Sequence, residues 1–432
     1  MPNHDLQISH IQSLKLAYQQ LLSAHGYDAV VISSGAGPGR FGDDQGYYHH
    51  GYGHFLHWTG LTGVENSWLR IDGDGLARLW LHRPEDFWHA VAPLPDEGWT
   101  REIEVIGQNT AELTAEALVG RVVLIGDPRA LSSVAGADGA AVNPAEFLAA
   151  LDRLRVCKSA YEIDCLERAT ALAARGHEAA RAAFEAGESE FGISLAYQRA
   201  TGQREEHAPY HSIIGLNEHG ATLHYQHYES SPPRPCRSLL IDAGARYRGY
   251  GSDITRTHAA AGEGHFAALI AGVNSLQKRL CNEISPGLDF VELHQLAHQG
   301  LAILLKAAGL VEGMTEEAIV ESGISRAFFP HGLGHLLGLQ VHDVAGKPRP
   351  APADSPFLRL THRLEEGMVL TVEPGLYFIP ALLEPVMAGK YGPHLNRSLI
   401  EHFYGCGGIR IEDNVVVTAN GHRNLTRAYL TA

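Results

Sequence analysis

The chain has 432 residues, enough for two domains, and apolar residues make up 45% of it, as in globular proteins. Its formal net charge of −15 argues against nucleic acid as a partner, because phosphate binding needs a basic surface. The five cysteines are scattered without a Cys-x-x-Cys pair, the N-terminus lacks the pattern of a signal peptide, and no stretch is apolar enough for a membrane span, so we expect a cytoplasmic protein with no membrane contact.

The N-terminal third of the chain alternates helix and strand signals. A helical segment over residues 11–24 is followed by a short apolar strand at residues 28–33. Residues 68–81 have the pattern of a hairpin around a Gly-Asp-Gly turn, and another buried strand begins at Val122. These signals predict a compact α/β domain, smaller than the one that follows, over residues 1–156.

A domain boundary is expected near residues 155–159, so the second domain spans residues 157–432. Ser159 and Glu162 have the spacing of a capping box, in which the hydroxyl and the carboxylate satisfy free N–H groups reciprocally. A helix should therefore begin here, and we expect it to end near Gly187.

The second domain contains two more predicted helices and several strands. The helices cover about residues 266–284 and 290–308, and each ends at a glycine. The expected strands lie at residues 238–242, 253–257, 368–373 and 408–417. Helices grouped apart from mainly antiparallel strands predict an α+β fold for this domain.

Four acidic residues lie inside or at the ends of these apolar strands: Asp242, Asp253, Glu373 and Glu412. Carboxylates in such positions are rarely fully buried unless they are paired or bind metal. For any one of them a salt bridge or a cap is the better explanation, but four in one domain favour a functional site. The glycine-rich segment between Asp242 and Asp253 predicts a hairpin that brings both carboxylates to one region of a sheet.

Three histidines, His331, His335 and His342, lie in a segment rich in glycine and leucine. One of them could be a hydrogen-bonded core residue, but this explanation is weak for all three. One imidazole with four carboxylates is a hard, oxygen-rich ligand set. Such a set suits Mn²⁺ and similar divalent ions more than it resembles a thiolate-type zinc site. Without cations these carboxylates would repel one another and some would protonate. Two divalent ions bridged by carboxylates, roughly 3.5–4 Å apart, would remove the repulsion and turn a shared water into a hydroxide nucleophile.

These motifs resemble the signature of the pita-bread metallopeptidase superfamily, which contains methionine aminopeptidases, aminopeptidase P and prolidases. The resembling pieces are Ile-Asp-Ala-Gly at residues 241–244, Ser-Asp-Ile-Thr-Arg-Thr at 252–257, Pro-His-Gly-Leu-Gly-His-Leu-Leu-Gly at 330–338, Val-His-Asp-Val at 341–344, Thr-Val-Glu-Pro-Gly at 371–375 and Gly-Ile-Arg-Ile-Glu-Asp at 408–413. Over nearly its whole length the chain is similar to bacterial Xaa-Pro dipeptidases, or prolidases, and to relatives named for organophosphorus acid anhydrolase activity. Residues 79–89, 217–225 and 356–359 carry this narrower resemblance.

The resemblance implies a role for each metal ligand. Asp242 and Asp253 share one metal, Asp253 and Glu412 bridge the two ions, and His335 and Glu373 complete the second. Glu373 also serves as the general base for the water's proton. The expected cofactors are two divalent ions per subunit, Mn²⁺ first, with Co²⁺, Fe²⁺ and Zn²⁺ as alternatives.

The resemblance also assigns residues around the substrate. His342 and Arg410 join the general base as catalytic residues, and Tyr210, His224 and His331 match substrate-binding positions. The histidines line the pocket and stabilise the tetrahedral intermediate, while the tyrosine is a pocket wall. Two simpler explanations stay open at this stage: Arg410 as a salt-bridge partner of the bridging glutamate, and Tyr210 as core packing.

An arginine is expected to select the substrate. A Xaa-Pro bond has no N–H group through which a peptidase could orient it. A cation that binds the proline carboxylate through charge-assisted hydrogen bonds would restrict the substrate to dipeptides. Arg359 matches the position proposed for this role, and the neighbouring Arg363 leaves the choice open.

The sequence thus predicts a dinuclear-metal hydrolase that cuts Xaa-Pro dipeptides and releases proline, with a side activity on organophosphorus esters. The alternative enzyme is an aminopeptidase P type that removes the first residue of longer Xaa-Pro peptides. The alternative outside enzymology is a binding module that has lost catalysis, which the five retained ligands disfavour. A homodimer is expected, with the N-terminal domain serving dimerisation and substrate access.

Overall fold

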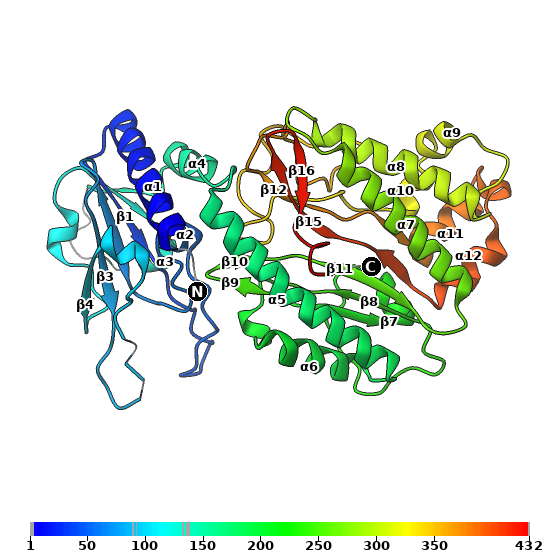
Figure 1. Cartoon of the computed structure of the whole chain (residues 1–432), viewed down its shortest axis with the longest axis horizontal. Coiled ribbons are helices and arrows are strands. Elements are labelled where there is room, and N and C mark those ends of the chain that lie inside the picture. The colour runs from blue at the N-terminus through cyan, green and yellow to red at the C-terminus, as the bar shows by residue number, and fades with distance from the viewer. Residues whose placement is uncertain (1–3, 89, 92, 132–133, 135–138, 431–432) are drawn as a thin grey trace. The chain divides into compact units, whose positions relative to one another are not determined.

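The computed structural model describes residues 4–88, 90–91, 93–131, 134 and 139–430. The chain divides into two compact units, shown in Figure 1. The first contains residues 1–155 together with 159–164, and the second contains residues 156–158 and 165–432. The first turn of helix α5 therefore belongs to the N-terminal unit.

The first unit is built on one mixed sheet with the strand order β4-β3-β2-β1-β5-β6. Its strands are β1 (Ala29–Ser33), β2 (Trp68–Asp72), β3 (Ala77–His82), β4 (Glu104–Gln108), β5 (Val122–Ile125) and β6 (Ala141–Val142). Its helices are α1 (His4–His25), α2 (Gly53–Thr59), α3 (Pro128–Leu131) and α4 (Ala145–Arg153), with short 3₁₀ turns η1 (Gly98–Arg101) and η2 (Ala115–Leu118).

The central strand β1 explains why this unit is α/β. All of its residues are buried, and it pairs antiparallel with β2 and parallel with β5. Helices α1 and α4 share an apolar cluster with β1, β2, β3 and β5, so they cover one face of the sheet. The predicted hairpin is confirmed, since β2 and β3 pair antiparallel across the Gly-Asp-Gly turn. The α/β prediction for the N-terminal domain is therefore confirmed.

The second unit contains most of α5 (Ala160–Glu185) and the rest of the helices. These are α6 (Glu190–Thr201), α7 (Gly264–Glu283), α8 (Phe290–Ala307), α9 (Glu316–Glu321), α10 (Ile324–Phe328), α11 (Pro380–Ala388) and α12 (Arg397–Tyr404), with 3₁₀ turns η3 (Glu205–His207), η4 (Asn217–Ala221) and η5 (Gly392–His394). Its strands are β7 (Ile213–Leu216), β8 (Ser238–Asp242), β9 (Arg246–Tyr247), β10 (Tyr250–Gly251), β11 (Thr255–Ala259), β12 (Val369–Val372), β13 (Gly375–Tyr377), β14 (Gly408–Arg410), β15 (Asp413–Thr418) and β16 (Gly421–Asn424).

These strands form small antiparallel sheets that helices cover from outside. One sheet has the order β11-β8-β7, another β12-β15-β16, and β13 pairs with β14. Helices α5 and α6 share an apolar cluster with β7 and β8. Helices α7 and α8 lie side by side in Figure 1 and pack with β12 and β15 in the largest apolar cluster. Segregated helices and antiparallel strands confirm the predicted α+β class.

Local sequence signals place the helix ends closely. Ser159 N–H donates to Glu162 Oε2 at 2.8 Å, and the Ser159 hydroxyl accepts from Glu162 N–H at 3.4 Å, as in the predicted capping box. Helix α5 ends at Glu185, shortly before Gly187, whose φ of +82° favours glycine. Both later helices begin and end within two residues of their predicted limits.

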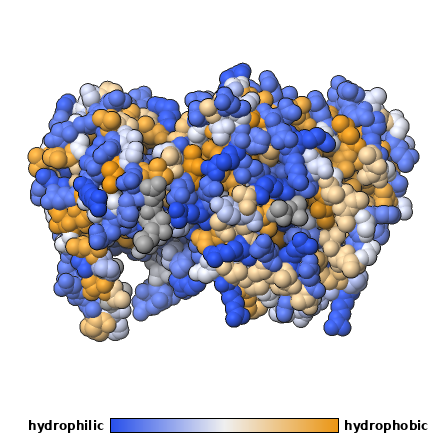
Figure 2. Space-filling model, in the orientation of Figure 1, coloured by the Kyte–Doolittle hydropathy of each residue, from blue (hydrophilic) through white to orange (hydrophobic). Residues whose placement is uncertain are grey.

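No helix among the described residues is long and apolar enough to cross a membrane. The face drawn in Figure 2 likewise mixes hydrophilic and hydrophobic residues, with no continuous apolar band over the coloured surface.

Candidate metal centre

The sheet register brings three carboxylates together. Strand β8 ends at Asp242, and β11 begins two residues after Asp253, with Thr255 paired opposite Asp242. An isolated bridge then pairs Thr255 with Glu412, which lies between β14 and β15. The predicted pairing of the segments around Asp242 and Asp253 is confirmed, and it gathers carboxylates that are distant in sequence.

The histidine segment is fixed to β12 by backbone hydrogen bonds. Thr371 N–H donates to the His335 carbonyl at 2.9 Å, and His335 N–H donates to the Thr371 hydroxyl at 3.1 Å. Glu373 N–H donates to the Leu333 carbonyl at 2.9 Å. A Cβ at Gly334 would lie 2.1 Å from the Thr371 carbonyl oxygen, so only glycine permits this approach. These contacts place His335 and Glu373 beside each other.

The tautomer of His335 leaves a lone pair on the nitrogen that faces the carboxylates. Its Nδ1 lies 2.9 Å from the Leu336 carbonyl oxygen, a pure acceptor, so Nδ1 carries the proton. Its Nε2 lies 3.3 Å from Asp253 Oδ2 and 3.7 Å from Glu373 Oε1. One ligand atom from each of Asp253, His335 and Glu412 lies within 4.8 Å of the others, and all three residues are buried. This arrangement is typical of a metal-binding histidine oriented by its second nitrogen.

The buried carboxylates at this centre repel one another. Burial and the neighbouring Asp242 raise the pKa of Asp253 well above its usual range. Burial and Glu412 do the same for the pKa of Glu373, and burial and Asp253 for the pKa of Glu412. Buried like charges of this kind are stabilised by bound cations. The oxygen-rich donor set therefore fits divalent metal ions.

Tyr210 contacts the carboxylates directly. Its hydroxyl lies 2.7 Å from Asp242 Oδ1 and 2.5 Å from Asp253 Oδ1. A phenol has one proton, so it donates to one carboxylate at a time. Burial and the negative charges of Asp242 and Asp253 raise the pKa of Tyr210, which keeps the proton in place. Tyr210 is thus a pocket residue that also orients two candidate metal ligands.

Arg410 pairs with a different carboxylate from the one that the sequence suggested. Its Nη2 donates to Asp242 Oδ2 at 2.6 Å, and its Nε donates to the Thr255 hydroxyl at 3.1 Å. The Thr255 hydroxyl in turn donates to Glu412 Oε2 at 2.6 Å. Arg410 therefore forms its salt bridge with Asp242 and reaches Glu412 only through Thr255.

Tyr377 is a site residue that the sequence reasoning missed. Arg410 Nη1 donates to its hydroxyl at 2.6 Å, and the same hydroxyl lies 2.9 Å from His331 Nε2. His331 Nδ1 donates to the Gly332 carbonyl at 2.9 Å, so Nε2 accepts the tyrosine proton. Tyr377 lies two residues beyond the motif at residues 371–375, and Thr255 lies inside the motif at residues 252–257. Nothing in the spacing of the sequence distinguishes either residue from an ordinary core residue.

One cavity of about 670 Å³ gathers the candidate residues of the second unit. All eleven line it: Tyr210, His224, Asp242, Asp253, His331, His335, His342, Arg359, Glu373, Arg410 and Glu412. The His342 ring stands edge-on to His335 with ring centres 4.4 Å apart. Apolar wall residues complete the cavity: Ile213, Leu223, Val341, Phe357, Ile379 and Leu382. Its volume is in the range of small-molecule sites.

The two neighbouring arginines face different surroundings. Arg359 is exposed and lines the cavity, and its charge lowers the pKa of His335 after the larger effect of burial. Arg363 Nη1 donates to the Gly287 carbonyl at 2.6 Å, and Arg363 is absent from the cavity lining. Of the two, Arg359 is therefore the one that lines the cavity.

Comparison with known proteins identifies the family. Residues 164–419 match metallopeptidase family M24, and residues 5–152 match the N-terminal domain of Xaa-Pro dipeptidases. The chain belongs to metallopeptidase family M24. The Xaa-Pro dipeptidase of Marinobacter nauticus is 57% identical over 99% of both chains, and that of Edwardsiella ictaluri is 44% identical over 98% of both. This M24 protein is therefore a metal-dependent hydrolase.

Solved structures support the fold. Proline aminopeptidase P II from Yersinia pestis superposes with a TM-score of 0.73 at 25% identity, covering 98% of this chain and 97% of the other. An aminopeptidase P variant from Escherichia coli in complex with substrate gives a TM-score of 0.73 at 22% identity, covering 98% and 96%. The predicted pita-bread domain, preceded by a smaller α/β domain, is thereby confirmed.

Proposed function

We propose that this M24 protein is a Xaa-Pro dipeptidase that uses two divalent metal ions and releases proline. The observation that carries the proposal is the cavity in which five candidate ligands, the pocket histidines and an exposed arginine converge. Full-length relatives described as Xaa-Pro dipeptidases support the substrate class.

The metals would be held by Asp242, Asp253, Glu412, His335 and Glu373. Two divalent ions bound there would polarise the scissile carbonyl and lower the pKa of a bound water. We expect Mn²⁺ because oxygen donors dominate, and Co²⁺, Fe²⁺ and Zn²⁺ are the alternatives.

The chain's own residues then orient the substrate and move protons. Glu373 lies at the end of β12 with a carboxylate whose raised pKa suits a group that takes a proton and returns it to the leaving nitrogen. His342 lines the same cavity and can donate to the carbonyl oxygen as charge develops on it. His331 also lines the cavity, and its ring is held by Gly332 and Tyr377, so it shapes the substrate pocket. Tyr210 and Arg410 hold the Asp242 carboxylate from two sides, at 2.7 and 2.6 Å, which keeps this ligand in position.

The lining of the cavity suits a proline residue with a free carboxylate. Phe357, Ile379 and Leu382 offer apolar surface for the pyrrolidine ring, and Arg359 lines the same cavity. A guanidinium binds a carboxylate through two parallel hydrogen bonds, and a longer peptide lacks a carboxylate at that place. The exposed His224 lines the same cavity and completes the predicted substrate-binding set.

The test of the function is proline release from Gly-Pro and Ala-Pro, compared with cleavage of Ala-Pro-Ala, by metal-stripped enzyme with and without added Mn²⁺. We expect fast, Mn²⁺-dependent cleavage of the dipeptides alone. Equal cleavage of the tripeptide would make the protein an aminopeptidase P type, the alternative that the similarity to solved aminopeptidase P structures favours. No cleavage of either substrate would refute both.

Substrate selection has its own test. We expect Arg359→Ala to raise KM for Ala-Pro at least tenfold with a smaller change in kcat, because the variant loses ground-state binding. Arg363→Ala is the matched control, since Arg363 contacts Gly287 away from the cavity. An unchanged KM for Arg359→Ala would remove this residue from the proposal.

Three expectations of the sequence stay predictions: hydrolysis of organophosphorus esters, a homodimer in which the N-terminal domain takes part, and a cytoplasmic location. The first is measured by release of the leaving group from a phosphotriester, and the second by light scattering of the purified chain.

A further inference from the structure

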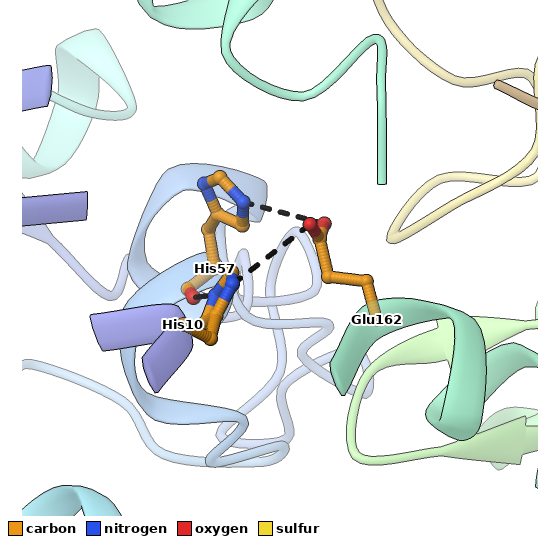
Figure 3. Close-up of side chains that lie close together, drawn as sticks. All are labelled: His10, His57 and Glu162. Atoms are coloured by element: carbon orange, nitrogen blue, oxygen red, sulfur yellow. Dashed lines mark hydrogen bonds and ion pairs between the residues drawn. The ribbon is translucent and has the colours of Figure 1, made fainter. Parts of the chain in front are cut away.

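A second cluster of ligating side chains lies in the N-terminal unit, separate from the candidate metal centre. His10 comes from α1, His57 from α2 and Glu162 from the first turn of α5, and all three belong to this unit. They are 3%, 2% and 3% exposed. Figure 3 shows both imidazoles facing the Glu162 carboxylate.

His10 is oriented by a backbone carbonyl. Its Nε2 lies 2.8 Å from the carbonyl oxygen of His57, a contact drawn in Figure 3. Because a carbonyl oxygen can only accept, Nε2 carries the proton. The lone pair is thus on Nδ1, which lies 3.8 Å from Glu162 Oε2 and 2.9 Å from the Ser159 hydroxyl. Metal-binding histidines commonly have this arrangement, in which the second nitrogen donates to a carbonyl.

The Glu162 carboxylate is held in place by the start of its own helix. Ser159 N–H donates to Oε2 at 2.8 Å, which fixes the rotamer. The other oxygen, Oε1, lies 3.3 Å from His57 Nε2. The capping box therefore presents one carboxylate to two imidazoles.

His57 has no hydrogen bond that would explain its burial. Among the described residues neither ring nitrogen has a hydrogen-bond partner with acceptable geometry. Its Nε2 lies 3.3 Å from Glu162 Oε1 outside good hydrogen-bond geometry, although this carboxylate still opposes the larger lowering of the His57 pKa by burial. Buried polar nitrogens nearly always have a partner, so the ring is incompletely satisfied by the protein alone.

The spacing of the three groups fits a tetrahedral ion. Zinc binds imidazole nitrogen and carboxylate oxygen at roughly 2.0–2.2 Å, which places tetrahedral ligand atoms roughly 3.3–3.5 Å apart. His57 Nε2 lies 3.3 Å from Glu162 Oε1, and His10 Nδ1 lies 3.8 Å from Glu162 Oε2. One ligand atom from each of the three residues lies within 4.8 Å of the others. Small side-chain shifts would bring all three into range.

We propose that His10, His57 and Glu162 form a structural Zn²⁺ site. The Ser159 hydroxyl or a water supplies the fourth ligand. A ligand set of two imidazoles and one carboxylate suits Zn²⁺. The candidate centre of the second unit, with mostly oxygen ligands, suits it less well. Because the cluster is buried and lies outside the substrate cavity, the ion would tie α1 and α2 to the start of α5 and take no part in the reaction.

The surroundings set a limit on affinity. The positive charge of buried Arg155 acts on His57 and opposes a further cation. Because the fourth ligand is a neutral hydroxyl or water, we expect weaker binding than in a closed structural zinc site.

The direct test is a crystal of the wild-type chain grown with Zn²⁺, with anomalous difference maps recorded at the zinc edge. We expect a peak roughly 2.0–2.2 Å from His10 Nδ1, His57 Nε2 and a Glu162 oxygen. The same peak is expected in Asp253→Asn, in which zinc at the candidate catalytic centre is reduced. A filled catalytic centre with no peak at the cluster would overturn the proposal and leave the proposed function intact.

A solution test uses the zinc content after dialysis of metal-stripped protein against Zn²⁺. Glu162→Gln keeps the size of the side chain and the capping acceptor, and should bind one Zn²⁺ per chain fewer than wild type. His25→Asn, which removes another histidine of α1, is the control and should match wild type. Zinc should also raise the thermal midpoint of wild type more than that of Glu162→Gln. Equal zinc content in wild type and Glu162→Gln would refute the site.

Discussion

The substitution Tyr377→Phe tests the hydrogen-bond network behind the metal centre. The Tyr377 hydroxyl accepts from Arg410 Nη1 at 2.6 Å and donates to His331 Nε2, 2.9 Å away. The side chain is fully buried, so water cannot replace the lost hydroxyl easily. Phenylalanine fills the same space without the oxygen, which confines the change to these two bonds.

The expected loss follows from the two bonds. A hydrogen bond to a charged group contributes about 1.5–3 kcal/mol, and a neutral one about 0.5–1.5 kcal/mol. Tyr377→Phe should therefore lower the free energy of unfolding by about 2–4.5 kcal/mol. Since Arg410 also holds the candidate ligand Asp242 at 2.6 Å, we expect metal affinity and kcat/KM to fall roughly 10–100-fold.

Urea unfolding of the metal-free enzyme measures the change, because bound metal would add its own stabilisation. The midpoint should fall while the slope stays constant. Tyr197→Phe is the matched control, since the Tyr197 hydroxyl is buried without a hydrogen-bond partner among the described residues, and its removal should cost nothing. If Tyr377→Phe unfolds within about 0.5 kcal/mol of wild type, the network does not stabilise the protein as argued.

Three further predictions concern other parts of the second unit. Asp253→Asn should release metal and reduce turnover by more than about 100-fold, measured by metal content and proline release, and retained metal would contradict its role as a ligand. The Lys158–Asp343 ion pair is 2.8 Å long and fully buried, so Lys158→Met should cost about 3–5 kcal/mol in urea unfolding. The double variant with Asp343→Leu should lose less than the single variant, and a loss equal to the sum of the two single losses would mean that the charges are independent. Burial lowers the pKa of His294 to about 4 and that of His298 to about 3. Below about pH 6.5 the two histidines bind protons in the unfolded chain but stay neutral in the folded protein. The free energy of unfolding should therefore fall toward pH 4 by up to about 1.4 kcal/mol per pH unit for each histidine. His298→Asn should flatten this dependence, and an unchanged slope would exclude His298 as its source.

The sequence by itself determined the local structure and the residue types of the candidate centre. The capping box at Ser159 fixed the start of α5, because its partners lie three residues apart and interact whatever the rest of the chain does. Acidic residues at the ends of apolar strands, such as Asp242 and Glu412, indicated a charged site, because burial of an unpaired carboxylate costs too much free energy. Both arguments use only neighbours along the chain.

The tertiary structure alone decided which of these residues meet. The contacts of Arg410 with Thr255 and Asp242 join positions 155 and 168 residues apart, through sheet register that no local pattern encodes. The same holds for the contacts of Tyr377, and for the cluster around Glu162, to which α1 and α2 contribute their histidines from residues far earlier in the chain. Packing of whole elements, and not spacing along the sequence, sets such long-range geometry, because the folded chain selects one register and one loop path from many that the same local signals allow.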